Sequence, residues 1–162
     1  MPAISRMRSY VMLPFVLLVL CLGLVATTVS TAPKADAITT RYAKVLDGVQ
    51  IAKNQQGDPY GYGYAGPGRF DCSGLVYFAM RKAGISVPRS SDAQAGYARR
   101  IAKSDMKPGD LMFFTYGGDV YHVAIFLGWK DGYRRMIDAP KSGDHVRIRR
   151  PWTAGWFAGT LR

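Results

Sequence analysis

The 162-residue sequence contains no glutamate, and it has only two cysteines and two histidines. Every acidic side chain is therefore an aspartate, and the 11 aspartates are outnumbered by 22 lysines and arginines, which gives a net charge of +11. Such an imbalance predicts anionic partners, with simple solubility as the competing interpretation. Nucleic acid is not expected among these partners, because the basic residues are scattered along the chain rather than clustered.

Internal repeats, low-complexity stretches and long linkers are also lacking. Hydrophobic residues make up 48% and charged residues 20% of the chain, close to the roughly 45–50% and 25% of soluble globular domains. Disordered and collagen-like classes are therefore excluded. The length fits one globular domain, which we expect over residues 38–162.

The first 37 residues are typical of an export signal. Arg6 and Arg8 precede an uncharged apolar run over residues 10–26, and Ala35-Asp36-Ala37 offers small residues at a cleavage site. The run lies at the lower edge of the roughly 17–25 residues that span a bilayer, so an uncleaved anchor is the alternative. We expect a secreted or cell-wall-associated protein outside the cytoplasmic membrane.

Cysteine use sharpens this expectation. Cys21 lies inside the export signal, and lipidation is not expected there because Leu20 stands where a lipidated cysteine needs a small residue. Cys72 is then the only cysteine of residues 38–162, and no disulfide can form within that domain. A lone thiol in an oxidising compartment is either buried and inert or retained because it reacts.

The apolar pattern predicts helices first and strands afterwards. Helical spacing of Tyr42, Val45, Leu46, Val49 and Ala52 predicts a helix over about residues 40–54. A second helix is expected to start at an Asp71 cap and to end at Gly84. Short apolar runs between turn residues then predict antiparallel strands over residues 110–114, 121–127, 133–137, 146–149 and 156–161. This order indicates an α+β domain with N-terminal helices packed on a small antiparallel sheet.

Cys72 is the candidate nucleophile. It falls in the first turn of the second helix, where free backbone N–H groups and the helix dipole favour a thiolate. The glycine-rich loop over residues 57–68 and the following Ser73-Gly74 favour an approachable position over a buried structural one.

A thiol nucleophile needs a base. His122 begins a predicted strand, where alternation places it on the face of Ala124 and Phe126, and the small Ala124 is expected to leave room for a cleft. His145 lies in a turn and is expected to be solvated. We therefore expect His122 to be the base.

The order of six motifs resembles that of the NlpC-type cell-wall cysteine peptidases, a bacterial branch of the papain-like fold, over about residues 49–150. The motifs are Asp58-Pro59-Tyr60 with Gly63, residues 70–76, residues 88–91 with Gln94, residues 107–111, residues 122–128 and residues 136–140.

The resemblance implies a catalytic set of Cys72 as nucleophile, His122 as general base and Asp138 as the orienting group. The family more often has histidine at the third position, but a carboxylate can also accept a hydrogen bond from imidazole. The resemblance further implies that Tyr60 stabilises the oxyanion together with the backbone N–H of Cys72. Substrate-groove positions fall at Asp71, Ser73, Arg89 and Ser91.

Asp138 lies 16 residues beyond His122, after a tight connection through Asp131-Gly132. Alternation places Asp138 on one strand face with Met136, and adjacent strands are expected to bring it beside His122. The competing interpretation is a surface ion pair with Arg134, which would have no catalytic consequence.

The resemblance implies a peptidoglycan hydrolase that cleaves stem-peptide amide bonds through a thioester. The expected bond joins the γ-carboxyl of D-glutamate to a diamino acid such as diaminopimelate. The residues alone indicate only amide or thioester chemistry. We expect a monomer that needs no cofactor or metal and that meets peptidoglycan stem peptides and anionic wall polymers.

Two alternatives from other classes stay open. A metal-dependent wall hydrolase would use His122, His145 and Asp144 or Asp138, but no paired-histidine spacing supports zinc. A catalytically inactive wall-binding module would contact glycans through Trp152 and Trp156, for which strand packing is the competing interpretation.

Overall fold

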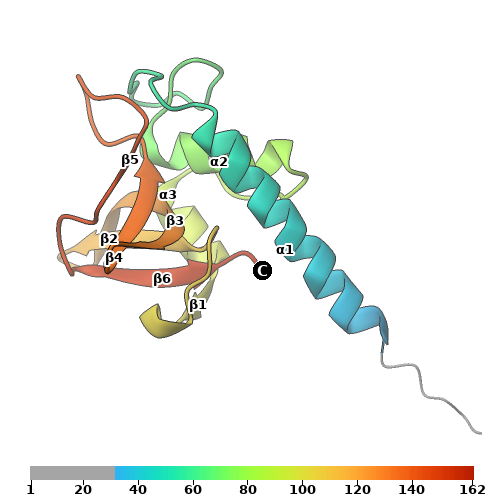
Figure 1. Ribbon diagram of the computed structural model, residues 1–162. Helices are drawn as coiled ribbons and strands as arrows, with labels where there is room; N and C mark the ends of the chain where they lie inside the picture. Colours follow the sequence, from blue (N-terminus) through green and yellow to red (C-terminus); the bar gives the residue numbers. More distant parts are fainter. Residues whose placement is uncertain (1–31) are drawn as a thin grey trace, which may run out of the picture. The chain divides into compact units, whose positions relative to one another are not determined.

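The computed structural model describes residues 32–162, so that residues 1–31 of the expected export signal lie outside the described part. Helices come first and strands follow, as the sequence predicts, but there are three helices and six strands where two helices and five strands were expected (Figure 1). The helices are α1 (Ala32–Lys53), α2 (Cys72–Lys82) and α3 (Ser91–Tyr97), and a short 3-10 helix, η1 (Lys103–Asp105), follows the first strand. The strands are β1 (Arg99–Ile101), β2 (Leu111–Tyr116), β3 (Asp119–Lys130), β4 (Tyr133–Asp138), β5 (Arg147–Arg149) and β6 (Trp156–Thr160).

The six strands form one antiparallel sheet in the order β1-β6-β2-β3-β4-β5. The long strand β3 pairs with β2 on one side and with β4 on the other. The β3–β4 turn is the expected Asp131-Gly132, and both residues have positive φ angles, of 53° and 76°. This tight turn starts the pairing of β4 with β3, and a β-bulge between Phe126 and Gly128 then shifts the register by one residue.

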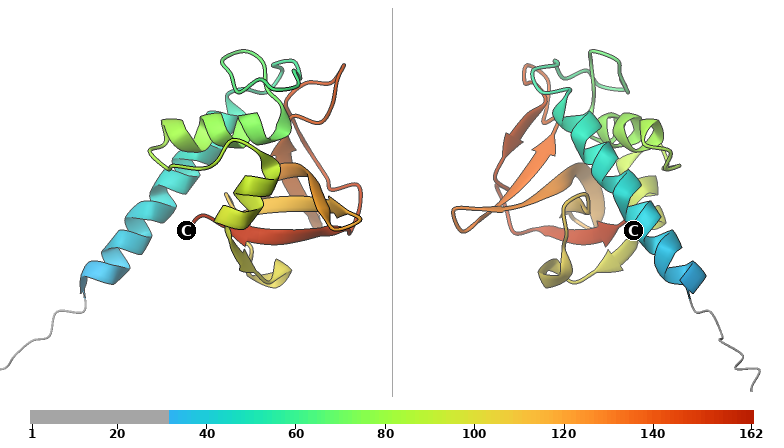
Figure 2. Two further views of the ribbon diagram at one scale, coloured as in Figure 1. Left: turned by 180° about the vertical axis from the view of Figure 1, so that it is seen from behind. Right: turned by 45° about the vertical axis from the view of Figure 1, so that its right-hand side comes forward.

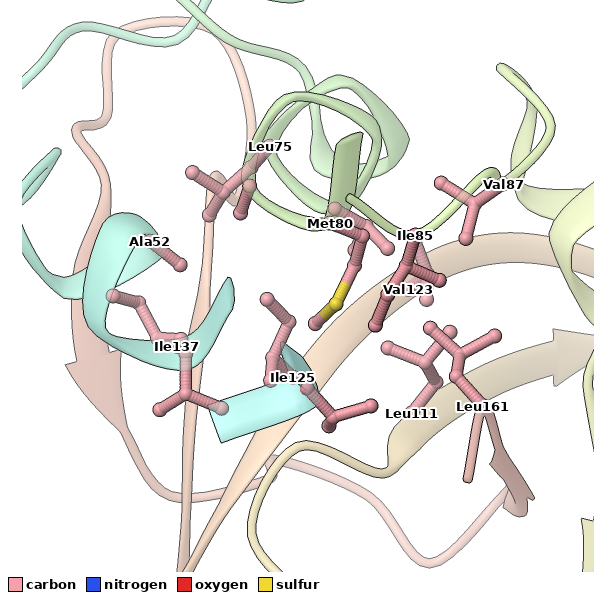
Figure 3. Packing of buried hydrophobic residues seen from close by; sticks show 14 of the residues in the cluster. Ala52, Leu75, Met80, Ile85, Val87, Leu111, Val123, Ile125, Ile137 and Leu161 are labelled. Carbon is pink, nitrogen blue, oxygen red and sulfur yellow. The ribbon is translucent and has the colours of Figure 1, made fainter. Parts of the chain in front are cut away.

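One face of the sheet packs against α1 and α2 (Figure 2). Alternate residues of β3 and β4, namely Val123, Ile125 and Ile137, point to this face and meet Leu75 and Met80 of α2 (Figure 3). All five are buried, and a fully buried side chain of this kind contributes about 1.5–3 kcal/mol. The main core therefore fixes α2, and with it Cys72, relative to β3.

The opposite face has a smaller core of its own. Ala124 is buried there rather than lining a cleft, so the expectation that it leaves room was wrong. The other members of this core are mostly larger side chains, which fill the space around its methyl group. They include Met112, Phe114, Phe126, Met136 and Trp156.

Helix α1 begins eight residues earlier than the apolar pattern predicts. Residues 36–41 are exposed, so no burial pattern marks these first turns in the sequence. Leu46, which the pattern counted as a core position, is 41% exposed, whereas Val45 and Val49 are buried. Within residues 32–162, no helix is long and apolar enough to cross a membrane.

Candidate active site

The site begins at the first turn of α2. Asp71 is the N-cap residue, and one of its carboxylate oxygens accepts the backbone N–H of Gly74 at 2.6 Å, as the sequence predicts. Cys72 follows as the first residue of the helix and is partly exposed, with a free thiol. Backbone N–H groups in a first helical turn lack helical partners and attract negative charge. This position suits a thiolate.

Asp71 is held by more than its helix. Arg89 donates to both carboxylate oxygens, at 3.0 and 2.6 Å, and the Gly63 N–H and the Ser73 hydroxyl add bonds of 2.9 and 3.1 Å. Burial alone would raise the pKa of Asp71, but hydrogen bonds from Arg89 and Gly74 outweigh burial and lower it. The anionic carboxylate therefore ties the loop before α2 and Arg89 to the turn that carries the thiol.

Gly74 is required by the same loop. A Cβ atom at this position would lie 2.1 Å from the carbonyl oxygen of Tyr64, so any other residue would push the loop away from α2. Gln94 of α3 supports the turn from another side, because its buried side-chain amide donates to the carbonyl oxygen of Ser73 at 2.9 Å. The packing of Gly74 against the loop and the bond from Gln94 to the backbone of Ser73 thus fix the position of the Cys72 thiol.

His122 meets Asp138 across neighbouring strands. The Nε2 atom of His122, on β3, lies 2.7 Å from the Oδ2 atom of Asp138, at the end of β4. Both residues are buried. The structure therefore brings together the two side chains that strand alternation predicted to be neighbours.

The ion partner of Asp138 is Arg149 of β5, and the alternative of a surface pair with Arg134 was wrong. Arg149 donates from Nε to Oδ1 at 2.9 Å and from Nη2 to Oδ2 at 2.6 Å. Asp138 is fully buried, whereas the guanidinium of Arg134 lies 4.3 Å from the ring of Trp129. Strand β5 pairs with β4 after an intervening loop, so no short-range pattern pointed to Arg149.

These contacts set the protonation of the histidine. Burial alone would lower the pKa of His122, but hydrogen bonds with Asp138 and with the side chain of Cys72 outweigh burial and raise it to about 9. The pKa of Asp138 is lowered, because its bonds to His122 and Arg149 outweigh burial. Since Nε2 is engaged by Asp138, Nδ1 is the ring nitrogen left for the thiol. Cys72 thus faces an imidazolium at neutral pH.

A cleft of about 530 Å³ opens beside Cys72, and we call it the thiol-side cleft. Tyr60 has a raised pKa, first because of burial and then because of Cys72 and Asp71, so its hydroxyl keeps its proton and can donate it. In the wall of this cleft, Arg89 donates hydrogen bonds to both carboxylate oxygens of Asp71, so the two charges largely balance each other. All five predicted substrate or oxyanion residues line the cleft: Tyr60, Asp71, Ser73, Arg89 and Ser91.

A second cleft, of about 390 Å³, lies beside His122, and we call it the imidazole-side cleft. Tyr121 lines both clefts, and Cys72 lines the first while His122 lines the second. The walls of the imidazole-side cleft carry more positive than negative side chains, because Asp144 is the only acidic residue among the described residues that line it. The lining includes His122, Lys141, Asp144, Arg147, Arg149 and Trp152.

Trp152 is a site residue that sequence reasoning treated only as a glycan contact or a packing residue. Its ring stacks on Phe114 with centroids 4.3 Å apart and meets the ring of His122 edge-on at 5.3 Å. Arg149 lies 4.2 Å above the same ring. Trp156, by contrast, is buried in the smaller core. The sequence does not distinguish the two tryptophans, because the difference depends on where the loop before β6 places Trp152.

His145 is exposed and lies on the loop before β5, where its backbone pairs with Pro59. The structure thus does not bring it to His122. Within residues 32–162, no three histidine, cysteine or aspartate side chains converge on a point where they could hold a metal ion. Both oxygens of Asp138 are already engaged by His122 and Arg149.

Comparisons with known proteins identify related chains. The NlpC/P60 family model matches residues 57–162. The probable endopeptidase p60 of Listeria innocua is 43% identical over 105 residues, which is 65% of this chain and 21% of that protein. The chain therefore spans about a fifth of the length of this curated relative.

Solved structures share the fold. The peptidoglycan hydrolase RipB of Mycobacterium tuberculosis superposes with a TM-score of 0.66 at 29% identity, covering 76% of this chain and 67% of that one. RipD of the same organism, described as a non-catalytic NlpC/p60 domain protein with a peptidoglycan-binding function, gives a TM-score of 0.61 at 26% identity. It covers 74% of this chain and 98% of that one. Related domains thus include a hydrolase and a non-catalytic binder.

Proposed function

The chain belongs to the NlpC/P60 family, and we propose that it is a peptidoglycan endopeptidase that uses Cys72, His122 and Asp138. One observation carries the proposal. His122 is held at 2.7 Å by Asp138 while it interacts with a thiol at the first turn of a helix. A nucleophile, a base and a group that orients the base are the parts that covalent amide hydrolysis needs.

In the proposed mechanism, the Cys72 thiolate attacks the carbonyl carbon of the scissile amide, and the carbonyl oxygen becomes an oxyanion. The backbone N–H of Cys72 and the hydroxyl of Tyr60 stabilise this charge. One such donor is worth about 2.7–4 kcal/mol in a well-studied protease. The imidazolium of His122 then gives its proton to the leaving amine, and the C–N bond breaks to leave a thioester.

Hydrolysis of the thioester closes the cycle. Neutral His122 takes a proton from water, the hydroxide adds to the thioester carbonyl, and the Cys72 thiolate leaves. Asp138 acts through the histidine in both half-reactions, because it keeps Nε2 engaged and leaves Nδ1 facing the reaction. No step draws on a cofactor.

The two clefts support a direction for the substrate. The leaving amine must reach His122, so the leaving half of the peptide occupies the imidazole-side cleft and the acyl half the thiol-side cleft. Lys141 and Arg147 of the imidazole-side cleft suit a leaving group with a free carboxylate. Diaminopimelate carries such a group at its distal centre. This favours cleavage between the γ-carboxyl of D-glutamate and diaminopimelate.

The decisive experiment is digestion of purified muropeptides, followed by mass spectrometry. We expect fragments with a new amino group on the diamino acid, and no such fragments from Cys72→Ala. The two histidines offer a matched pair, since His122→Ala should lose activity while His145→Ala, at an exposed position, should keep it. Fragments with new reducing sugar ends alone contradict the proposal.

Two further readouts separate the alternatives. Inactivation by a thiol reagent, slowed by substrate and insensitive to chelators, is expected of a cysteine enzyme and not of a metal-dependent one. If the wild type binds peptidoglycan, releases no fragments and behaves like Cys72→Ala, the chain is a non-catalytic binder of the RipD kind.

We propose also that the domain acts outside the cytoplasmic membrane after removal of residues 1–37. Residues 36–41 of α1 are exposed, so cleavage after Ala37 would cost the core no side chain at positions 36 and 37. N-terminal sequencing of the exported protein should begin at Ile38. Sequence from Met1 or Pro2 in a membrane fraction establishes an anchor instead.

A further inference from the structure

A third cleft, of about 420 Å³, opens between the β3–β4 turn and the loop that precedes β6. Strand β6 starts at the end of the sheet away from α1 (Figure 1). None of the residues that line this cleft also lines the thiol-side or the imidazole-side cleft. We call it the basic cleft, defined by Lys103, Trp129, Tyr133, Arg134, Arg150 and Trp156.

The basic cleft carries three cations and no carboxylate in its lining. Across the described residues 32–162, none of these cations forms an ion pair. All three lie over aromatic rings instead, and Lys103 also donates to the carbonyl oxygen of Ala154 at 3.0 Å. The distances to the ring centroids are 3.9 Å from Lys103 to Trp156, 4.3 Å from Arg134 to Trp129 and 3.4 Å from Arg150 to Tyr133.

The cations are held together without an anion to balance them. The pKa of Lys103 is lowered, first by burial and then by the positive charge of Arg134. The Nε atom of Arg134 is buried and has no hydrogen-bond partner. A negatively charged group between Lys103 and Arg134 would offset the repulsion between these two cations.

The aromatic residues indicate what carries the negative charge. Trp129 is 58% exposed and Tyr133 is 52% exposed, although both already support a guanidinium. Exposed flat rings beside cations suit a ligand with apolar ring faces as well as acidic groups. Sugars and nucleobases both offer such faces. A domain that acts on peptidoglycan, as proposed above, meets sugars.

We propose that the basic cleft binds an acidic saccharide segment of a cell-wall polymer. The phosphate or carboxylate lies between Lys103 and Arg134, and a sugar ring stacks on Trp129. The choice of saccharide over oligonucleotide rests on the proposed function, whereas the charge recognition does not. Such a site would hold the enzyme on the wall while the catalytic clefts engage stem peptides.

Binding can be measured without catalysis by using the full-length Cys72→Ala protein. The probes are teichoic acid, which carries phosphodiesters, polygalacturonate, which carries carboxylates, and the neutral glycan dextran. Polyphosphate, which lacks sugars, and a single-stranded oligonucleotide test the other ligand classes. We expect both acidic glycans to bind and dextran not to bind.

The site variant combines Lys103→Gln, Arg134→Gln and Arg150→Gln. A matched control combines Lys82→Gln, Arg81→Gln and Arg100→Gln. These three cations are exposed and also lie over aromatic rings, and their substitution removes the same amount of charge. We expect affinity for the acidic glycans to fall about tenfold or more in the site variant, about 1.4 kcal/mol or more, and less than twofold in the control. Equal losses in the two variants overturn the proposal, because they mean diffuse attraction.

Trp129→Ala tests the sugar without changing charge, and it covers the case in which the triple variant does not fold. It should weaken binding of acidic glycans severalfold and leave polyphosphate unaffected. Unchanged glycan binding, or an oligonucleotide that binds as tightly as the glycans, overturns the saccharide assignment. Because every measurement uses an inactive protein, these outcomes are independent of whether muropeptides are cleaved.

Discussion

Two buried carboxylates support the reactive pair, and they differ in what they hold. Asp71 and Asp138 each accept two bonds from one arginine, Arg89 and Arg149 respectively. The remaining partners of Asp71 are two backbone N–H groups and a hydroxyl, none of which titrates near neutral pH. The remaining partner of Asp138 is an imidazole.

The difference separates two ways of supporting catalysis. Asp71 fixes where the thiol stands, because its partners are a helix start and a loop. Asp138 fixes the charge of the base, because its bond to His122 is the main cause that raises the pKa of that residue. Variants of Asp71 should therefore alter stability without moving the pH profile, whereas variants of Asp138 should move the pH profile.

Asp138→Ala should give the largest effect. We expect kcat to fall roughly 10²–10³-fold with KM nearly unchanged, since the group acts on chemistry rather than on substrate binding. The high-pH limb of kcat/KM, expected near the His122 pKa of about 9, should move toward the ordinary histidine value of about 6.5. Initial rates from pH 5 to 10 measure both.

Asp138→Asn is the matched variant, because its amide oxygen still accepts the bond from His122 while its charge is lost. It should be milder than Asp138→Ala. A loss of less than about threefold in folded Asp138→Ala protein means that the orienting group lies elsewhere.

Asp71→Ala should act mainly on stability. It removes a helix cap, worth about 1 kcal/mol, and leaves buried donors without acceptors, at about 1–3 kcal/mol. We expect the free energy of unfolding to fall by about 2–4 kcal/mol, measured by denaturant titration. The high-pH limb should stay near 9 in the protein that remains folded. A shift as large as that of Asp138→Ala would show that both carboxylates act on the histidine.

The two arginines offer the smallest and sharpest contrast. Arg149→Gln removes a cation that shares Asp138 with His122, so the pKa of His122 should rise, by less than about one unit. Arg89→Gln should leave the pKa of His122 unchanged. The measurement is the same high-pH limb, and a fall of the limb in Arg149→Gln contradicts the assigned roles.

Sequence reasoning reached the contacts that short-range rules control. Alternation and the Asp131-Gly132 turn predicted that Asp138 lies beside His122, and the structure has this contact. The prediction did not include the β-bulge between Phe126 and Gly128, which shifts the pairing by one residue and places Asp138 on the same strand face as His122. The Asp71 cap and the Gly84 stop are likewise local signals, and both are present.

Contacts that depend on long-range packing were not predictable in this way. Arg149 reaches Asp138 from a strand that follows a loop, and Trp152 reaches His122 from the loop before β6. Neither loop has a periodicity that fixes where it folds back. Short elements such as α3 and β1 were missed for a related reason, since three to seven residues carry too little pattern.

The edge-on contact of Trp152 with His122 has an optical consequence. A protonated imidazole quenches the fluorescence of a nearby indole, and the two ring centroids are 5.3 Å apart. Indole emission of the native protein should therefore rise as His122 loses its proton, with Trp152→Phe as the blank that removes the signal. The charge of the catalytic histidine can thus be followed by light, in a cuvette without substrate.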